Sequence, residues 1–161
     1  GTINTVKAVL PQMRRQKRGR IICISSVAAV YSIPFQAHYS ASKAAINSFV
    51  DALTNEVKSF GIEATSVMPG DISTGFTAAR IKSNAGDDVY SGVIGSAVSA
   101  MEKDEKNGMT PDSVARLVVK LAEKKHVAPL YTAGLQYKTL VFLSRLLPHK
   151  LAVKVVGGMY K

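Results

Sequence analysis

The residues of this chain that could do chemistry together are Ser26, Tyr39 and Lys43. Tyr39 and Lys43 are four residues apart, so on a helix their side chains lie on the same face, one turn apart. Ser26 lies thirteen residues before Tyr39, at the end of an apolar, β-rich run, which leaves enough chain for a loop to fold back. A hydroxyl, a phenol and an ammonium group brought together make a proton-transfer site suited to a carbonyl or an alcohol.

These three side chains would have complementary parts in such a reaction. A free tyrosine has a pKa of about 10, and a cation one helical turn away favours the phenolate, which makes tyrosine usable as a general acid or base near neutral pH. A serine hydroxyl can donate a hydrogen bond to the substrate oxygen on which negative charge develops. None of the three groups can supply a hydride, so a redox reaction would need a cofactor.

Taken singly, each residue also has a purely structural interpretation. A tyrosine and a lysine four residues apart form a surface pair on many helices, and Ser25 and Ser26 could simply turn the chain or cap a helix. The order of features favours a site. A β-rich strand ends in Ser-Ser, Tyr-Ser-Ala-Ser-Lys then opens an Ala-rich helix, and a second strand ends in Pro-Gly.

Alternating helices and strands must position these residues. Apolar periodicity and the Gly and Pro positions predict helices at 2–17, 39–59 and 110–124, strands at 20–25, 62–68 and 127–131, and two tail helices separated by Pro148. Gly61 would end the second helix, and Thr110 would cap the third with Pro111 at its first position. Residues 75–108 read as irregular, with a turn at 83–88 and short helical pieces on either side. The alternation indicates an α/β fold with a parallel, right-handed sheet.

The composition is that of a globular domain. A chain of 161 residues can form one domain with its own core, and 47% hydrophobic with 20% charged residues excludes a disordered chain. The single cysteine, Cys23, lies inside an apolar strand, which excludes a disulfide framework and predicts a buried, inert thiol. A reducing cytoplasm is therefore the default location.

The net charge of +10 is concentrated in two segments. Residues 14–20 hold five Lys or Arg, and residues 124–161 hold seven with no Asp or Glu. Such patches can bind nucleic acid or an anionic membrane. No aromatic residues alternate with the first cluster to stack on bases, so we expect no nucleic-acid binding. We interpret this cluster as a solvated loop whose acidic counterpart lies in a part of the protein that precedes the chain.

The tail, residues 137–161, alternates apolar stretches with basic residues. It has no run of about 20 uninterrupted apolar residues, the length that a membrane span needs. Three interpretations stay open: a flap over a hydrophobic substrate, an oligomer contact, and a basic amphipathic helix that lies on a membrane surface. The apolar character of the tail favours a hydrophobic substrate over a sugar-like one.

Taken together, the ordered motifs resemble those of the classical short-chain dehydrogenases/reductases. The resemblance covers roughly residues 1–135, and its matching segments are 8–13, 19–26, 39–43, 69–74 and 110–115. It implies a Rossmann-like, three-layer α/β fold of which this chain is the C-terminal portion. Residues 1–136 would be the C-terminal part of the catalytic domain, and residues 137–161 the tail helices of the same domain.

The resemblance also implies roles for the three chemical residues. Tyr39 would be the general acid/base, and Lys43 would hold the nicotinamide ribose hydroxyls and favour the phenolate. Ser26 would orient the substrate carbonyl, and it is preferred to Ser25 because the serine of this family usually lies thirteen residues before the tyrosine. Residues 75–108 would form a lid over the substrate.

A second group of residues would hold the cofactor, NAD or NADP. The resemblance implies that Pro69 and Gly70 line the nicotinamide pocket, together with Tyr39 and Lys43. The backbone of Ile72 and the hydroxyl of Thr74 would bind the carboxamide. A small carbonyl or alcohol substrate and a homo-oligomer are implied as partners, and no metal is.

One part of the family pattern is missing from the chain. A Gly-rich strand–turn–helix normally binds the pyrophosphate, and a residue at the end of the next strand selects NAD or NADP; neither is present. The chain starts with Gly1 in mid-pattern, so the resemblance implies that about a hundred residues precede it, by analogy with the usual length of the family.

The sequence therefore predicts an NAD(P)-dependent oxidoreductase that interconverts a carbonyl and an alcohol, with a hydrophobic substrate. Two alternatives stay open. One is a non-catalytic fragment without a pyrophosphate site, and the other is a membrane-surface or partner-binding module that uses the basic tail. The expected location is the cytoplasm, and membrane association through residues 137–161 stays open as an alternative.

Overall fold

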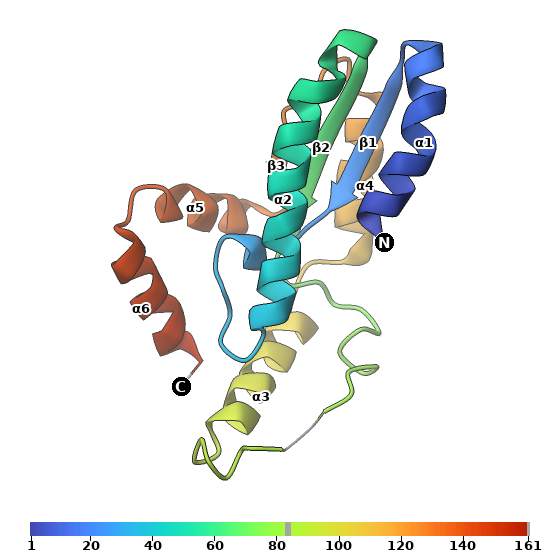
Figure 1. Ribbon diagram of the computed structural model, residues 1–161. Coiled ribbons are helices and arrows are strands. Elements are labelled where there is room, and N and C mark those ends of the chain that lie inside the picture. Colours follow the sequence, from blue (N-terminus) through green and yellow to red (C-terminus); the bar gives the residue numbers. More distant parts are fainter. Residues whose placement is uncertain (83–84, 161) are drawn as a thin grey trace.

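Three β-rich segments form one parallel sheet in the order β1–β2–β3 (Figure 1). The computed structural model describes residues 1–82 and 85–160. The strands are β1 (Gly19–Ile24), β2 (Ile62–Met68) and β3 (Leu130–Thr132). The helices are α1 (Thr2–Gln16), α2 (Ala37–Val57), α3 (Val93–Lys106), α4 (Pro111–Glu123), α5 (Leu135–Ser144) and α6 (His149–Met159), with one-turn 3-10 helices η1 (Val27–Ala29) and η2 (Lys58–Phe60).

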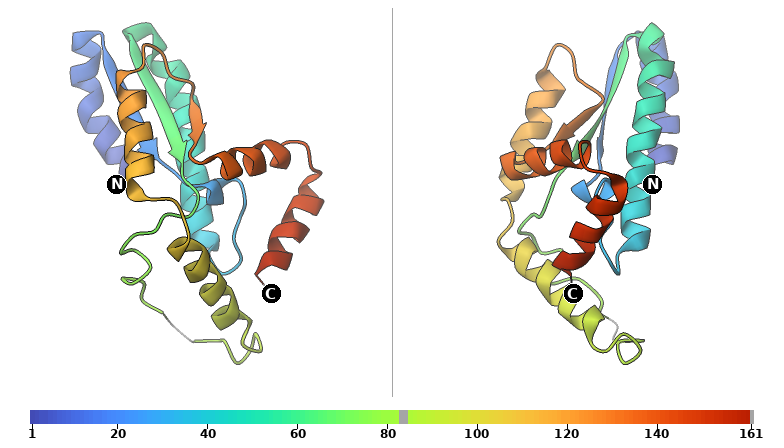
Figure 2. Two further views of the ribbon diagram at one scale, coloured as in Figure 1. Left: turned by 180° about the vertical axis from the view of Figure 1, so that it is seen from behind. Right: turned by 90° about the vertical axis from the view of Figure 1, so that its left-hand side faces the viewer.

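Helices cover both faces of the sheet. Helices α1 and α2 pack on one face and α4 packs on the other (Figure 2). On the first face, Ile21 and Cys23 of β1 meet apolar side chains of both helices, because alternate strand residues point to the same side. Val50 and Val57 of α2 are fully buried there. The three-layer α/β fold expected from the sequence is confirmed, and Cys23 is buried as predicted.

The carboxyl ends of β1 and β2 lie at the same edge of the sheet, because the two strands are parallel. Backbone hydrogen bonds continue the pairing past the strand ends. The Ser25 N–H donates to the Val67 carbonyl at 2.7 Å, and the Val27 N–H donates to the Pro69 carbonyl at 2.9 Å. The segment after β1 is therefore held beside the segment after β2.

The long helix ends as predicted, at a glycine. Helix α2 is followed by the turn η2 and then by Gly61, whose φ of 67° is a left-handed conformation that glycine adopts without strain. A Cβ at Gly61 would also lie 2.5 Å from the Lys17 carbonyl oxygen. The start of β2 therefore requires glycine for both conformation and space.

The prediction of an irregular stretch over 75–108 was wrong for its second half. Residues Val93–Lys106 form one continuous helix, α3, in which Ala97 and Met101 are buried one turn apart. Asp87 caps this helix, because its carboxylate accepts hydrogen bonds from the N–H groups of Ile94 and Gly95 at 3.0 and 3.3 Å. The cap lies several residues before the helix, outside the usual N-cap position. Of the predicted turn at 83–88, residues 83 and 84 lie outside the described part of the chain, and Ala85–Asp88 form a turn.

Two smaller predictions are also corrected. Strand β3 starts at Leu130 instead of 127, because the Val127 N–H donates to the Glu63 carboxylate and Pro129 has no N–H to pair. Thr110 occupies the N-cap position of α4, with Pro111 next, but its side chain makes no capping hydrogen bond.

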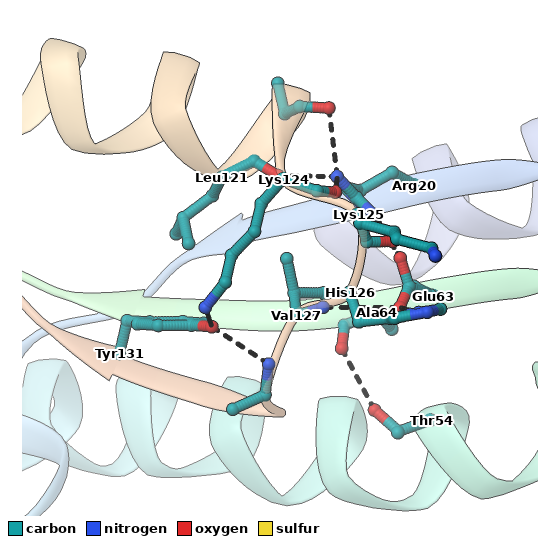
Figure 3. Close-up of polar contacts among 12 residues, drawn as sticks. Arg20, Thr54, Glu63, Ala64, Leu121, Lys124, Lys125, His126, Val127 and Tyr131 are labelled. Carbon is teal, nitrogen blue, oxygen red and sulfur yellow. Dashed lines mark hydrogen bonds and ion pairs between the residues drawn. The ribbon is translucent and has the colours of Figure 1, made fainter.

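The basic cluster at 14–20 is not simply a solvated loop. Arg20 lies in β1 and forms an ion pair with Glu63 of β2 (Figure 3). The same guanidinium donates hydrogen bonds to carbonyl oxygens at the end of α4, those of Leu121, Ala122, Lys124 and Lys125. Helix C-termini leave such carbonyls without intrahelical partners. Arg20 thus joins two strands to α4, and its acidic counterpart lies within this chain.

Replacing Glu63 by glutamine is expected to destabilise the fold in a pH-dependent way. Burial acts to raise the pKa of Glu63, but hydrogen bonds from Arg20, Val127 and His126 outweigh it and hold the pKa below its ordinary value. Such a carboxylate stabilises the folded state above its unfolded pKa of about 4.3, and the contribution is lost as the pH falls through the folded pKa. We expect Glu63→Gln to lower the free energy of unfolding by about 1 kcal/mol at pH 7, a value reduced by solvent screening.

Chemical denaturation of the full-length protein between pH 3 and 7 tests this. The difference between wild type and Glu63→Gln should shrink as the pH falls below about 4, because the Glu63 carboxylate then becomes protonated and neutral, whereas glutamine is neutral throughout. Glu56→Gln is the matched control, because Glu56 is exposed on α2. A difference that is the same at pH 3 and pH 7 would contradict the role of the charge.

Candidate active site

Ser26, Tyr39 and Lys43 line one large cavity of about 1170 Å³ at the carboxyl edge of the sheet. Ser26 follows β1 and precedes η1, whereas Tyr39 and Lys43 lie in the first two turns of α2. Seven residues, 30–36, separate η1 from the start of α2, and this connection loops back beside the helix (Figure 1). The structure therefore brings the three sequence-predicted chemical residues to one place.

The two neighbouring serines have different environments. The Ser26 Oγ accepts a hydrogen bond from the Ala28 N–H at 3.1 Å, which leaves its own hydrogen free to donate into the cavity. Ser25 is buried, with 3% of its surface exposed, and its Oγ donates to the Lys43 carbonyl oxygen at 2.9 Å. Ser25 thus fixes α2 against the end of β1, and Ser26 is the serine that faces the cavity.

Tyr39 and Lys43 lie against one another at the cavity wall. The Lys43 Nζ is 5.6 Å from the centre of the Tyr39 ring and donates a hydrogen bond to the Ile24 carbonyl oxygen at 3.0 Å. This bond uses one of the three ammonium hydrogens, so two remain for other acceptors. Burial lowers the pKa of Lys43 below its ordinary value. The Tyr39 side chain is partly accessible, and the residue is 39% exposed.

The segment after β2 forms a second wall of the cavity. Gly70, Ile72 and Thr74 line the cavity, whereas Pro69 does not and instead accepts the Val27 N–H with its carbonyl oxygen. The Thr74 Oγ1 accepts a hydrogen bond from the Phe76 N–H at 3.1 Å, so its hydroxyl hydrogen is available. We call residues 69–74 the cofactor loop, from the role that the sequence assigns to it.

The direction of the Ile72 backbone is set by a short parallel pairing with Met109. The Met109 N–H donates to the Asp71 carbonyl at 2.8 Å, and the Ser73 N–H donates to the Met109 carbonyl at 2.9 Å. In this pattern the bonds are made by the residues on either side of Ile72, and the N–H of Ile72 points away from Met109. No hydrogen bond of residues 1–82 and 85–160 uses the Ile72 N–H, so it is a free donor.

A third wall of the cavity is apolar and comes from the tail. It consists of apolar side chains of α5, of α6 and of the turn between them, namely Leu140, Leu143, Leu147, Val155, Val156 and Met159. We call this set the tail wall. Helices α5 and α6 extend from the end of the sheet beside the cavity (Figure 2). Helix α5 starts at Leu135, two residues before the tail boundary expected from the sequence.

Sequence reasoning missed two residues of the site, Tyr137 and Asp71. Tyr137 is buried and lines the cavity, and its hydroxyl bonds to both the backbone and the side chain of Asp71. The one available signal was a tyrosine within an apolar helix, since a buried phenol requires a hydrogen-bond partner. The partner lies 66 residues earlier, which no local pattern reveals.

Residues 1–82 and 85–160 contain neither a helix that could span a membrane nor a cluster of metal-ligating side chains. None of the helices there is long and apolar enough to cross a membrane. In the same part of the chain, no three His, Cys, Asp or Glu side chains gather in a way that could hold a metal ion.

Comparison with known proteins gives one family. The family model described as short chain dehydrogenase matches residues 1–85, which is more than half of the chain. A 3-ketodihydrosphingosine reductase of Bacteroides thetaiotaomicron is 41% identical over 128 residues, covering 78% of this chain and 48% of that protein. The dehydrogenase/reductase SDR family member 7B of Xenopus laevis is 36% identical over 148 residues, covering 92% of this chain and 42% of that protein.

Solved structures show the same fold. A short chain dehydrogenase from Burkholderia cenocepacia in complex with NADP has a TM-score of 0.69 at 19% identity, covering 95% of this chain and 53% of that one. A 3-oxoacyl-[acyl-carrier protein] reductase from Brucella melitensis with bound NAD has a TM-score of 0.59 at 27% identity, covering 84% and 46%. The chain thus spans about half the length of the relatives it matches.

Proposed function

The chain belongs to the short-chain dehydrogenase family, and on this premise we propose that it carries the proton-transfer half of an NAD(P)-dependent oxidoreductase that interconverts a carbonyl and an alcohol. The observation that carries the proposal is the cavity itself. Ser26, Tyr39 and Lys43 line it together with Gly70, Ile72 and Thr74 of the cofactor loop.

In the direction of reduction, the Tyr39 phenol gives its proton to the carbonyl oxygen as that oxygen gains negative charge. Ser26 donates a hydrogen bond to the same oxygen, which its free hydroxyl hydrogen permits. Lys43 stabilises the phenolate that remains, since its ammonium lies beside the tyrosine ring. In the direction of oxidation, the phenolate takes the proton back from the alcohol.

The donors of the site fit a nicotinamide. Its carboxamide oxygen requires a hydrogen-bond donor, which the free Ile72 N–H supplies, and the Thr74 hydroxyl is a second partner. The two remaining hydrogens of the Lys43 ammonium suit the ribose hydroxyls. When bound, the reduced cofactor supplies the hydride that none of these residues can. The chain itself contains no residue that would select NAD over NADP, so we propose either.

The tail wall supports a hydrophobic substrate. Six apolar side chains of α5, α6 and the turn between them line the cavity, and burial of apolar surface stabilises a complex by about 25 cal/mol per Å². The Bacteroides relative is named for the reduction of 3-ketodihydrosphingosine. We therefore propose a ketone that carries a long alkyl chain, with the carbonyl at Tyr39 and the chain against the tail wall.

The test is a turnover assay that follows the oxidation of NADH or NADPH by the full-length protein, expressed from its complete coding sequence. We expect turnover with 3-ketodihydrosphingosine and much less with a short β-keto ester. Titration of the 161-residue chain with NADH and NADPH addresses the non-catalytic alternative, because micromolar binding by this chain alone would rule that alternative out. Absence of turnover with every ketone tested would contradict the proposal.

Replacing Leu143 by serine is expected to raise the KM for a long-chain ketone about fivefold. Leu143 belongs to the tail wall, and the loss of about 1 kcal/mol of apolar contact corresponds to that factor. The KM for a short ketone should change less than twofold. The matched control is Phe142→Ser, because Phe142 is the adjacent residue, is 61% exposed and does not line the cavity. Equal effects of the two variants would contradict the placement of the alkyl chain.

A second function is favoured by the outward side of the tail. Leu135, Phe142 and Leu146 are each more than 60% exposed, in a segment that also carries Lys138, Arg145 and Lys150. Apolar and cationic side chains together suit contact with an anionic membrane surface, and exposed apolar patches also mark oligomer contacts. Co-sedimentation with anionic vesicles that is unaffected by removal of residues 137–161 would contradict the membrane contact.

A further inference from the structure

Tyr137 of α5 packs directly on the cofactor loop. It is 9% exposed, and its ring lies against Gly70 so closely that a Cβ at Gly70 would be 2.1 Å from the ring carbon Cζ. The same ring belongs to an apolar cluster with Val27 and Met68. The position of Tyr137 is therefore determined from several sides, and the ring sets how close the loop can come.

The hydroxyl of Tyr137 binds Asp71 twice. It accepts a hydrogen bond from the Asp71 N–H at 3.1 Å and donates one to the Asp71 Oδ2 at 2.8 Å. The Asp71 carbonyl oxygen accepts a third bond, from the Met109 N–H at 2.8 Å. The N–H, the carbonyl and the carboxylate of Asp71 are thus all held by hydrogen bonds. The Tyr137 hydroxyl makes the bonds to the N–H and to the carboxylate.

Asp71 directly precedes Ile72, whose N–H is the free donor of the cofactor loop. Because the peptide between Asp71 and Ile72 is planar, the Met109 N–H that holds the Asp71 carbonyl also orients the Ile72 N–H, and Tyr137 fixes the residue that carries this carbonyl through its N–H and its carboxylate. Phenylalanine at 137 would leave the Asp71 N–H and its carboxylate without these partners. Burial raises the pKa of the Asp71 carboxyl, the hydrogen bond from Tyr137 opposes this rise, and the charges of Asp104 and Glu105 add to it.

We propose that Tyr137 is a positioning residue for the nicotinamide carboxamide, acting through Asp71 on the N–H of Ile72. This inference rests on the proposed function. It gives the tail a part in the cofactor site besides its contact with the substrate. Helix α5 also holds the other side of the cavity, because the Tyr31 hydroxyl donates to the Leu140 carbonyl oxygen.

The test compares two tyrosine-to-phenylalanine variants of the full-length protein. Tyr137→Phe is expected to weaken binding of NADH or NADPH about tenfold, measured as a Kd by fluorescence titration, with kcat at saturating cofactor changed less than threefold. Tyr131→Phe is the matched control, because the Tyr131 hydroxyl also makes two hydrogen bonds, both as acceptor, from Lys124 and the Ala128 N–H, and it does not line the cavity. A Kd for Tyr137→Phe within twofold of wild type would overturn the proposal.

A double-mutant cycle tests the route through Asp71. If Tyr137 acts through Asp71, introducing Tyr137→Phe into the Asp71→Ala protein should raise its Kd for NADH or NADPH by less than twofold. Additive effects of the two substitutions would overturn the route.

Amide hydrogen exchange separates this inference from the proposed function, since it needs no cofactor. Exchange at residues 69–74 should be at least fivefold faster in Tyr137→Phe than in wild type, and unchanged in Tyr131→Phe. If the wild-type protein binds neither nucleotide, the proposed function fails, but the exchange rates still show whether Tyr137 holds the cofactor loop in place. Unchanged exchange in Tyr137→Phe would overturn the positioning role in either case.

Discussion

Replacing Tyr39 by phenylalanine in the full-length protein is expected to lower kcat about 10³-fold, with the cofactor Kd changed less than threefold. A positioned general acid contributes roughly 10²- to 10⁴-fold, and phenylalanine removes the proton while it keeps the ring. The proposed carboxamide contacts come from the cofactor loop, which the substitution does not touch. The measurement is steady-state oxidation of NADH or NADPH with a saturating ketone, beside a binding titration.

Tyr90→Phe is the control for Tyr39→Phe. Tyr90 is 57% exposed and packs edge-on against Phe35, a residue of the cavity wall, but it does not line the cavity itself. Loss of its hydroxyl should leave kcat within twofold of wild type. If Tyr39→Phe kept a tenth or more of the wild-type kcat, the assignment of Tyr39 as the proton donor would be contradicted.

The parts of the site that depend on neighbours along the chain could be predicted from the sequence. The pairing of Tyr39 with Lys43 follows from their helical spacing, and the parallel sheet follows from the alternation of strands and helices. Ser26 could be distinguished from Ser25 only by family resemblance. The structure gives the physical reason, since Ser25 is bonded to the backbone of α2.

Interactions between distant residues account for what the sequence did not reveal. Helix α3 depends on Asp87, which caps it from outside the usual cap position. The start of β3 depends on a carboxylate of another strand, that of Glu63. Arg20 looks like one member of a basic run, yet its partners are 43 and about a hundred residues away along the chain. Each of these contacts joins segments that no local pattern connects.

Replacing Gly70 by alanine is expected to be the most disruptive small change in the cofactor loop. The new Cβ would lie 2.1 to 2.3 Å from three carbons of the Tyr137 ring, so either the ring or the loop must move. Both movements break the hydrogen bonds between Tyr137 and Asp71. Overpacking of this kind costs about 3 kcal/mol, which we expect as a lower free energy of unfolding together with a cofactor Kd raised more than tenfold.

Gly75 provides a matched control for Gly70→Ala. It lies just after the same loop, and a Cβ there would meet no atom within 4 Å, so Gly75→Ala should leave both the stability and the Kd close to wild type. A cycle with Tyr137→Ala identifies the cause. Without the ring the three nearest contacts of the Cβ are gone, so Gly70→Ala should then cost less than about 1 kcal/mol in unfolding free energy. An equal cost in both backgrounds would mean that the glycine is needed for another reason, and that the contact between α5 and the loop does not set the position of the loop.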